Sequence, residues 1–317
     1  MSDIVVLDPG YPSYTYEEQL FGDQGYHLII SRECERDLKI AHAKEAKGVL
    51  VRGTLLDAAA LDRMPHLMAI VRYGTGYENI DIRHAARRGI RVANVQGYAS
   101  DSVSDHAIGL MYSCIRGIGH RWSGEFGAPF RREVFELHNK TLGIIGFGRI
   151  GSRMSRKAGP LFSRILACDP YQDSQQINAS GAIKSDRGEV LRESDVISVH
   201  CNLTRETHHL LDGKAFRSME RCPVILNTAR GAVVDSRALL EALESNRIHS
   251  AGLDVYEHEP PGSEEQKLIA HPRVIATPHV AWYSDTAQAE LQTRAADNLL
   301  ALLRGERIPD EITPENI

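Results

Sequence analysis

Three residues in the second half of the chain could together perform acid–base chemistry on an anionic substrate. Arg230 lies in the phrase Asn-Thr-Ala-Arg-Gly, Glu259 follows Val-Tyr-Glu-His, and His279 follows Thr-Pro. A guanidinium group is a planar, permanently charged partner for a carboxylate or a carbonyl oxygen. An imidazole, with an ordinary pKa of about 6.5, can donate a proton near neutral pH. We expect Glu259 to pair with His279, fixing the ring tautomer and raising the pKa of the imidazolium.

Each of these residues also has a simpler explanation. Arg230 could form a surface ion pair at a strand end, His279 could cap a helix or lie in a core, and Glu259 could be a solvated loop acid. Their occurrence together, each within a longer phrase, favours a catalytic site over those alternatives.

A glycine-rich motif typical of dinucleotide binding precedes this set. An apolar segment from Lys140 runs into G-x-G-x-x-G, and a helix is expected to begin near Arg149. The first glycine permits a tight turn, the second lets the backbone approach a pyrophosphate, and the third allows close helix packing. The helix N-terminus favours the phosphate charge. The expected cofactor-binding positions are Gly146, Gly148, Arg149, Ile150 and Gly151.

An acid follows the next predicted strand. Asp169 lies about 20 residues past the first glycine, as expected for a carboxylate that binds the adenine-side ribose hydroxyls. A carboxylate there repels a ribose phosphate, and Pro170 and Tyr171 supply no cation. The motif therefore predicts NAD (NADH) rather than NADP, although Asp169 taken alone could be a turn aspartate before proline.

The alternation of short apolar segments with helix-like segments predicts the elements that must hold these residues. Short apolar strands are expected at Ile4–Leu7, His27–Ile30, Gly48–Val51, Met68–Val71, Thr141–Ile145, Ile165–Cys168, Val196–His200, Val224–Asn227, His249–Leu253 and Val274–Ala276. Helices are expected at Tyr16–Phe21, Glu35–Ala46, Leu55–Met64, Ser102–Arg116 and Ala287–Arg304. This alternation predicts an α/β fold with two doubly wound parallel sheets, one per domain. If the last helix packs on the N-terminal sheet, residues 1–101 and 285–317 form one domain and 102–284 the other.

Composition and charge weigh against other classes of protein. The chain has 317 residues, with 37 Lys and Arg against 42 Asp and Glu, so no basic excess is available for a nucleic-acid backbone. No apolar run approaches the roughly 20 residues needed to cross a bilayer, and the first residues lack the basic region of a signal peptide. The scattered cysteines indicate reduced thiols. We expect a cytoplasmic protein with no direct nucleic-acid partner, no membrane partner and no metal.

With the glycine motif, three phrases closely resemble the D-isomer-specific 2-hydroxyacid dehydrogenases: Asn227–Gly231, Gly252–Pro260 and Thr277–Ser284. The segment Arg72–Asp81 resembles the substrate loop of that family, so the resemblance covers nearly the whole chain. It implies a Rossmann cofactor domain, a flavodoxin-like substrate domain and an active cleft between them. It also implies hydride transfer between NADH and a small 2-keto acid, giving a D-2-hydroxy acid.

The resemblance extends to individual residues. Arg230, Glu259 and His279 match the catalytic positions of the family. Further cofactor-binding matches are Thr204, Thr228, Ala229 and Asp254, although Asp254 could simply end a strand. The substrate-binding matches are Arg72, Tyr73, Gly74, Thr75, Gly76, Tyr98 and Trp282.

The substrate pocket resembles more than one branch of the family. Arg72 and Trp282 are similar to the C-terminal binding protein branch, where the matching residues reach the substrate. An indole there would favour an apolar or thioether tail, while a structural role for Trp282 at the domain interface is an equal alternative. Tyr98 instead matches the pocket tyrosine of the D-lactate dehydrogenases, and Gln96 stands where the family generally has proline. The pocket is therefore mixed and does not name one acid.

A second class of function is compatible with the same resemblance. The chain could be an NAD(H)-sensing interaction module, similar to the corepressors, in which cofactor-driven closure is the output and catalysis is vestigial. The absence of long recruitment tails weighs modestly against it. In either case the family implies a homodimer, formed through the helix Ser102–Arg116 and the segment that follows it.

Overall fold

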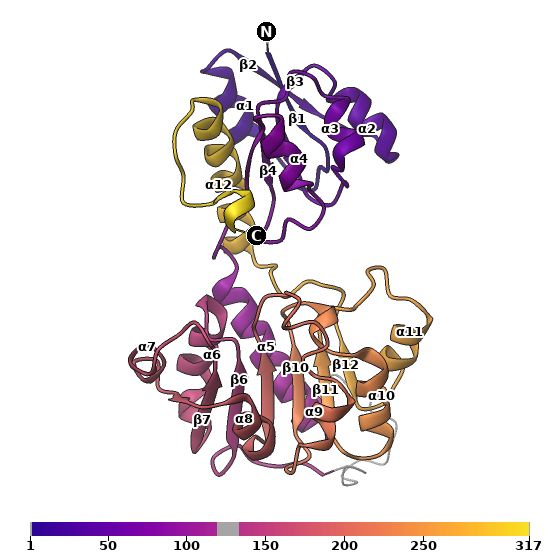
Figure 1. Ribbon diagram of the computed structural model, residues 1–317, viewed down its shortest axis with the longest axis vertical. Helices are drawn as coiled ribbons and strands as arrows, with labels where there is room; N and C mark the ends of the chain where they lie inside the picture. Colours follow the sequence, from indigo (N-terminus) through magenta and orange to yellow (C-terminus); the bar gives the residue numbers. More distant parts are fainter. Residues whose placement is uncertain (1, 119–132, 317) are drawn as a thin grey trace. The chain divides into compact units, whose positions relative to one another are not determined.

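The computed structural model describes residues 2–118 and 133–316. The chain forms two compact units, one made of the residues up to Tyr98 together with those from Ser284 onward, and one made of Ala99–Tyr283 (Figure 1). The units thus divide after residues 98 and 283, where the sequence placed the divisions after 101 and 284. Part of the segment assigned above to a dimer contact, residues 119–132, lies outside the described residues.

The first unit contains a six-stranded sheet in the order β13-β5-β4-β3-β1-β2. Its strands are β1 (Ser2–Val6), β2 (Tyr26–Ile30), β3 (Ala46–Val51), β4 (Ala69–Arg72), β5 (Arg91–Ala93) and β13 (Glu311–Ile312). All pairings are parallel except β13 with β5. The order 2-1-3-4-5 of the parallel strands is flavodoxin-like, as expected.

Helices cover both faces of this sheet. They are α1 (Thr15–Gly22), α2 (Arg36–His42), α3 (Ala58–Asp62), α4 (Ile82–Arg87) and α12 (Asp285–Leu303). Apolar residues of α2, α3 and α4 share one core with the strands, while α12 packs on β3 and β4 and against α1. Gly48 on β3 allows this contact, because a Cβ there would lie 3.2 Å from Leu299 of α12.

The second unit contains a seven-stranded parallel sheet in the order β12-β11-β10-β9-β6-β7-β8. Its strands are β6 (Thr141–Ile145), β7 (Arg164–Cys168), β8 (Ile183–Lys184), β9 (Val196–Val199), β10 (Val224–Asn227), β11 (Ser250–Leu253) and β12 (Val274–Ala276). The chain reverses its direction of winding between β6 and β9. That is the topological switch point, outside which ligands bind in open α/β sheets.

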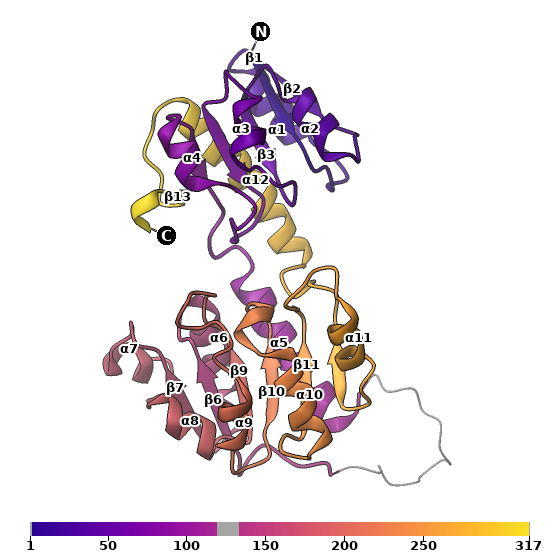
Figure 2. The ribbon, with the colours of Figure 1, turned by 45° about the vertical axis from the view of Figure 1, so that its right-hand side comes forward.

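Two helical layers cover this sheet as well (Figure 2). One layer contains α5 (Ser100–Arg116), α6 (Arg149–Ala158) and α7 (Ser174–Asn178), whose apolar residues share a core. The other contains α8 (Arg187–Glu193), α9 (Gly213–Arg217), α10 (Ser236–Glu244) and α11 (Ser263–Ile269). Gly252 on β11 lets α5 approach closely, since a Cβ there would lie 3.0 Å from that of Leu110.

The two-sheet fold predicted from the sequence is confirmed, with differences at the element ends. The predicted helix Glu35–Ala46 is shortened to α2, because the turn Ala43–Glu45 ends it before β3. The predicted helix Leu55–Met64 is shortened to α3, which begins where Asp57 caps it. Strands β5, β8 and β13 were not predicted. None of the described helices is both long and apolar enough to cross a membrane.

Candidate active site

The loops that carry the predicted site residues of the second unit leave the same edge of its sheet. They follow β6, β7, β9, β10, β11 and β12, and in a parallel sheet all these carboxyl ends meet at one edge. The described residues contain no group of three or more His, Cys, Asp and Glu side chains that could hold a metal ion.

The glycine motif forms the turn that its sequence predicts. Gly146 has a φ of 87°, in the left-handed region, and a Cβ there would lie 2.6 Å from the carbonyl carbon of His200. A Cβ on Gly151 would overlap the Gly146 carbonyl oxygen, so this glycine lets α6 begin against the loop. A Cβ on Gly148 would meet nothing within 4 Å. The backbone is therefore open at the point where a pyrophosphate would approach, beside Ile150 in the first turn of α6.

Asp169 is fixed at the end of β7, next to the glycine loop. Its Oδ2 accepts a hydrogen bond from Phe147 N at 2.7 Å, and its Oδ1 accepts one from Tyr171 N at 2.8 Å. Each carboxylate oxygen retains acceptor capacity beyond one backbone amide. The side chain can therefore still receive ribose hydroxyls, which is the role that its spacing predicts.

The loop after β10 presents a buried hydroxyl without a partner. Thr228 is 8% exposed, and its Oγ1 has no hydrogen-bond partner among the described residues. A buried unpaired hydroxyl is costly unless a ligand satisfies it. Together with the open space over Gly148 and the carboxylate of Asp169, this atom fits a bound dinucleotide such as NAD.

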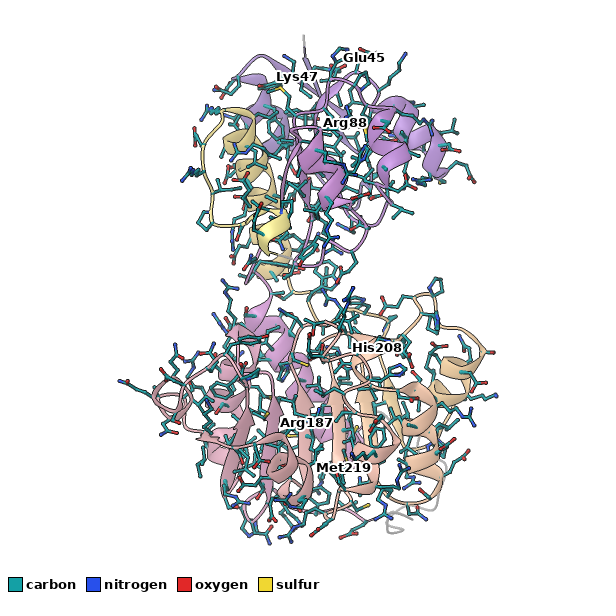
Figure 3. The ribbon with its side chains drawn as sticks, viewed as in Figure 1. Glu45, Lys47, Arg88, Arg187, His208 and Met219 are labelled. Atoms are coloured by element: carbon teal, nitrogen blue, oxygen red, sulfur yellow. The ribbon has the colours of Figure 1, made fainter. Side chains whose placement is uncertain are left out.

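The loop after β9 is exposed and closed by its own side chains. Thr204 N donates to Thr207 Oγ1 at 2.7 Å, and His208 N donates to Thr204 O at 2.9 Å. The ring of His208 (Figure 3) stacks on that of His209, with centroids 4.0 Å apart. His209 Nε2 lies 2.7 Å from Glu257 Oε2, which ties this loop to the one after β11.

The three predicted catalytic residues lie on the loops of three neighbouring strands. Arg230 follows β10, Glu259 follows β11 and His279 follows β12. His279 Nδ1 lies 2.6 Å from Glu259 Oε2, and the charge of Arg230 contributes to the pKa of Glu259. The side chains of His279 and Glu259 are 45% and 38% exposed. Within the described part of the chain, Nε2 of His279 forms no hydrogen bond, so this nitrogen can face a substrate.

A glycine brings the arginine loop against the acid loop. A Cβ on Gly231 would overlap the carbonyl group of Tyr256, so only a glycine allows this approach. Asn227 closes the turn that presents the arginine. Its Oδ1 accepts from Ala229 N at 3.0 Å, and its Nδ2 donates to Arg230 O at 2.9 Å. The separation between the arginine and acid loops is thus set by backbone contact.

The electrostatics of Glu259 favour its charged form. Burial raises the pKa of this carboxyl, but the hydrogen bond and charge of His279, the amide of Tyr256 and the charge of Arg230 together lower it below its usual value. Tyr256 N donates to Glu259 Oε1 at 3.1 Å. An ionised carboxylate can only accept, so His279 Nδ1 is the donor in this pair.

Asp254 organises the loop that carries the histidine. It is 1% exposed, and its carboxylate accepts from Val280 N at 2.9 Å, from Ala281 N at 2.8 Å and from Thr277 Oγ1 at 2.5 Å. His279 N also donates to the Asp254 carbonyl oxygen at 2.9 Å. The sequence assigned Asp254 to the cofactor, which stays a prediction, and the contacts found here hold the His279 loop. The sequence did not predict these contacts, because Asp254 and Ala281 are more than twenty positions apart and no local pattern connects them.

Two further residues support this loop. Trp282 Nε1 donates to the His279 carbonyl oxygen at 3.1 Å, so the indole lies beside the histidine as its position in the phrase suggests. His106 on α5 was not singled out from the sequence. Its Nε2 lies 3.0 Å from Thr277 Oγ1 and 3.6 Å from Asp254 Oδ1, which extends the network into the helical layer.

The predicted substrate loop of the first unit follows β4. Gly74 has a φ of 130°, and its carbonyl oxygen accepts from Val95 N at 3.0 Å. The Thr75 hydroxyl donates to the Val95 carbonyl oxygen at 3.3 Å. The amides of Gly74, Thr75 and Gly76 donate no hydrogen bond within the described residues. The loop, which begins after Arg72, thus offers backbone donors to an anion.

The side chain of Tyr73, which the sequence assigned to the substrate, lies in the core of this unit, whereas the assignment of Tyr98 stays a prediction. Tyr73 is 2% exposed, with its ring 5.1 Å from that of Tyr11 and its hydroxyl 3.4 Å from Glu17 Oε1. These contacts place its side chain in the core of the unit. Tyr98 is half-buried and lies close enough to Tyr11 for its charge to raise the pKa of that phenol, after the larger effect of burial.

Comparisons with known proteins agree with this geometry. The NAD-binding domain of the D-isomer specific 2-hydroxyacid dehydrogenases matches residues 108–281. The chain is 34% identical over 297 residues to a glyoxylate reductase of Pyrococcus furiosus, which covers 90% of this chain and 88% of the relative. It is 34% identical over 267 residues to a hydroxypyruvate reductase of Thermotoga maritima, which covers 83% and 86%.

A solved structure extends the likeness to both units. The apo-structure of D-lactate dehydrogenase from Escherichia coli superposes with a TM-score of 0.85 and 31% identity, covering 99% of this chain and all of that one. Similarity to the C-terminal binding protein branch is not tested by these relatives and stays a prediction. The chain belongs to the D-isomer specific 2-hydroxyacid dehydrogenase family and is an NAD-dependent oxidoreductase of that family.

Proposed function

We propose that this enzyme interconverts a small 2-keto acid and its D-2-hydroxy acid, with Arg230, Glu259 and His279 as the residues that act on the substrate. The observation that carries the proposal is the 2.6 Å contact of His279 Nδ1 with Glu259 Oε2, beside Arg230 on the neighbouring loop. The named relatives are a glyoxylate reductase, a hydroxypyruvate reductase and a D-lactate dehydrogenase. Their substrates share a carboxylate next to the reacting carbon.

Each residue has a separate task in this proposal. Bound NADH supplies the hydride. Arg230 binds the substrate carboxylate and polarises the carbonyl oxygen, because its guanidinium offers paired donors. His279 donates a proton from Nε2 to the oxygen that becomes the hydroxyl, and Glu259 holds the opposite nitrogen and stabilises the imidazolium. In the reverse direction the same imidazole removes that proton.

The first unit would contribute the remaining donors. We propose that the amides of Gly74, Thr75 and Gly76 bind the substrate carboxylate. Arg72 and Tyr98 are proposed to contact the remaining atoms of the substrate. The support is chemical, since unpaired amides and a cation are what an anion requires. Trp282 is placed beside the substrate tail because its indole lies next to His279.

The test is NADH oxidation with a panel of 2-keto acids: glyoxylate, hydroxypyruvate, pyruvate, phenylpyruvate and a methylthio-keto acid. Rapid turnover of at least one, with the D-hydroxy acid as product, supports the proposal and names the substrate class. Tight NADH binding with only trace turnover across the panel would contradict it and favour a sensing role. Production of the L-isomer would contradict the proposed D-2-hydroxy acid product.

A further inference from the structure

A carboxyl group without a cationic partner is buried in the first unit. Glu17 on α1 is 0% exposed, and within the described residues it forms no ion pair. Helices α1 and α12 lie side by side in both views (Figures 1 and 2). From α12, Gln292 Nε2 donates to Glu17 Oε1 at 2.9 Å and to Oε2 at 3.0 Å. Burial of an unpaired acid is costly, so this position calls for an explanation beyond stability.

The same carboxyl group contacts the residue that precedes the predicted substrate loop. The Tyr73 hydroxyl lies 3.4 Å from Glu17 Oε1, and Tyr73 comes directly before Gly74. Burial and the charge of Glu17 raise the pKa of the Tyr73 phenol, so this hydroxyl stays protonated and is the donor. Burial also raises the pKa of Glu17, against the hydrogen bonds from Gln292 and Tyr73. In either protonation state a carboxyl oxygen can accept from the phenol.

The other side of the predicted substrate loop is held from the end of β5. Val95 N donates to the Gly74 carbonyl oxygen at 3.0 Å. Asn94, which is 2% exposed, donates from Nδ2 to the Thr75 carbonyl oxygen at 2.5 Å. The loop therefore has two attachments, one through its carbonyl groups and one through Tyr73. Its amides lie between these attachments in the chain.

Ring packing alone does not account for the contact between Tyr73 and Glu17. The Tyr73 ring packs edge-on against that of Tyr11, with centroids 5.1 Å apart, and a phenylalanine could pack there in the same way. The hydroxyl adds a buried polar group, and Glu17 is its one partner among the described residues. A hydrogen bond requires a defined distance and angle, so it restricts the position of the ring further than apolar packing does.

We propose that Glu17 is a positioning residue for substrate binding, which acts through Tyr73 to hold the amides of Gly74, Thr75 and Gly76 in place for the substrate carboxylate. Neither Glu17 nor the Tyr73 ring touches the substrate. A loop that is fixed in advance loses less conformational freedom on binding, so the contact strengthens substrate binding. This inference rests on the proposed role of the loop in binding the substrate.

The first experiment measures steady-state kinetics and NADH affinity of the full chain with its best 2-keto acid. Glu17→Gln and Tyr73→Phe should each raise KM by about tenfold, as for loss of a hydrogen bond to a charged group, while kcat and NADH affinity stay within about twofold. Tyr16→Phe is the matched control. It removes another hydrogen bond between α1 and α12, from the exposed Tyr16 hydroxyl to Asp297 Oδ1 at 2.6 Å, and should change none of these quantities.

The second experiment needs no activity. It follows hydrogen exchange in peptides that contain the Tyr73 and Val95 amides, which donate to the carbonyl oxygens of Val51 at 2.8 Å and Gly74 at 3.0 Å. Exchange reports local opening of such hydrogen bonds. Both variants should accelerate it severalfold in the absence of substrate, and Tyr16→Phe should not.

Unchanged KM and unchanged exchange in stably folded Glu17→Gln and Tyr73→Phe would overturn the proposal, since packing would then suffice to hold the loop. Equal losses in Tyr16→Phe, or parallel losses of kcat and NADH affinity, would also overturn it, because they indicate general damage to the fold. If Glu17→Gln does not fold, Tyr73→Phe decides. Absence of turnover in the unaltered chain would contradict the proposed function instead, and the exchange experiment would still show whether Glu17 holds the loop.

Discussion

In each unit, an aspartate that follows a strand accepts hydrogen bonds from a neighbouring loop. The two loops held in this way differ. Asp8 follows β1, and its Oδ2 accepts from the amides of Arg52, Gly53 and Thr54, each at 2.9 Å. Asp254 follows β11 and accepts from the amides and hydroxyl of the loop that carries His279. Both carboxylates thus accept hydrogen bonds from loop amides that have no partner in a sheet.

The two aspartates differ in their counter-charge. Lys39 Nζ lies 2.6 Å from Asp8 Oδ1, a close ion pair. Asp254 has no lysine or arginine partner in the described residues, and the nearest ring nitrogen is that of His106 at 3.6 Å. The comparison teaches that one carboxylate is part of a charge-balanced structural cluster, whereas the other holds the loop whose histidine we propose as the proton donor. We expect loss of Asp8 to reduce stability and loss of Asp254 to reduce turnover.

The largest effect should come from the group that the Asp254 loop carries. His279→Gln removes the proposed proton donor but keeps a polar side chain, so kcat should fall by roughly 10²–10⁴-fold. NADH affinity should stay near normal, because the ring pairs with Glu259 rather than with the glycine loop. Steady-state kinetics and fluorescence titration measure the two quantities. If NADH affinity falls as far as kcat, the histidine is structural and the contrast with Asp8 disappears.

Removing the charge of Asp254 is expected to have the next largest effect. Asp254→Asn weakens charge-assisted hydrogen bonds to the His279 loop, which should lower kcat by roughly 10–100-fold through misplacement of the imidazole. Asp212→Asn is the control, since Asp212 caps α9 through Ala215 N and asparagine caps equally well. A variant with normal kcat but reduced Tm would place Asp254 in the same class as Asp8.

For Asp8 the expected effect is on stability. Burial raises the pKa of this carboxyl, but Lys39, Thr54 and the backbone amides lower it well below its usual value. A group with a lowered folded pKa stabilises the protein above its unfolded pKa, about 3.9, and loses that contribution as the pH falls. Asp8→Asn should therefore cost about 2–3 kcal/mol of unfolding free energy at pH 7.

Urea unfolding of both proteins between pH 7 and pH 3 measures this effect. The stability difference between the unaltered chain and Asp8→Asn should narrow below pH 4, because Asp8 then binds a proton in the unfolded chain while its lowered pKa keeps it ionised in the folded chain. The kcat of the variant should stay near normal at pH 7. A fall in kcat with unchanged stability would reverse the assignment of the two aspartates.

The smallest effect is expected at Trp282. Trp282→Phe removes the hydrogen bond to the His279 carbonyl oxygen but keeps an aromatic ring. One neutral hydrogen bond contributes about 1 kcal/mol, which corresponds to roughly fivefold in kcat. Rates with a short and a long 2-keto acid separate this positioning effect from a specificity effect. Equal losses for both acids indicate positioning, whereas a loss confined to the long acid indicates contact with its tail.

The sequence predicted what depends on short-range pattern. The glycine motif, the strand before it and the acid after β7 follow one another within a short segment, and all three occur as expected. The phrases with Arg230 and His279 likewise identified residues that the structure brings together. Strands β8 and β13, of two residues each, were missed because such short segments have no periodicity.

What the sequence did not predict depends on contacts across the fold. The carboxylate of Asp254 bonds to amides on the next loop, and His106 reaches the same network from α5. Tyr73 lies next to a substrate-like glycine loop, yet its ring packs into the core. Residue type indicates chemistry, whereas the direction of a side chain is decided by packing.

The backbone contact at Gly231 has a consequence for how this gene tolerates change. Since a single methyl group at this position would push the arginine loop away from Tyr256, a selection for activity should discard even alanine here. Ala232, one position later and only partly buried, should accept many replacements under the same selection. A mutational scan would thus record a sharp change in tolerance to substitution between codons 231 and 232. Libraries that seek new substrates should leave codon 231 unchanged.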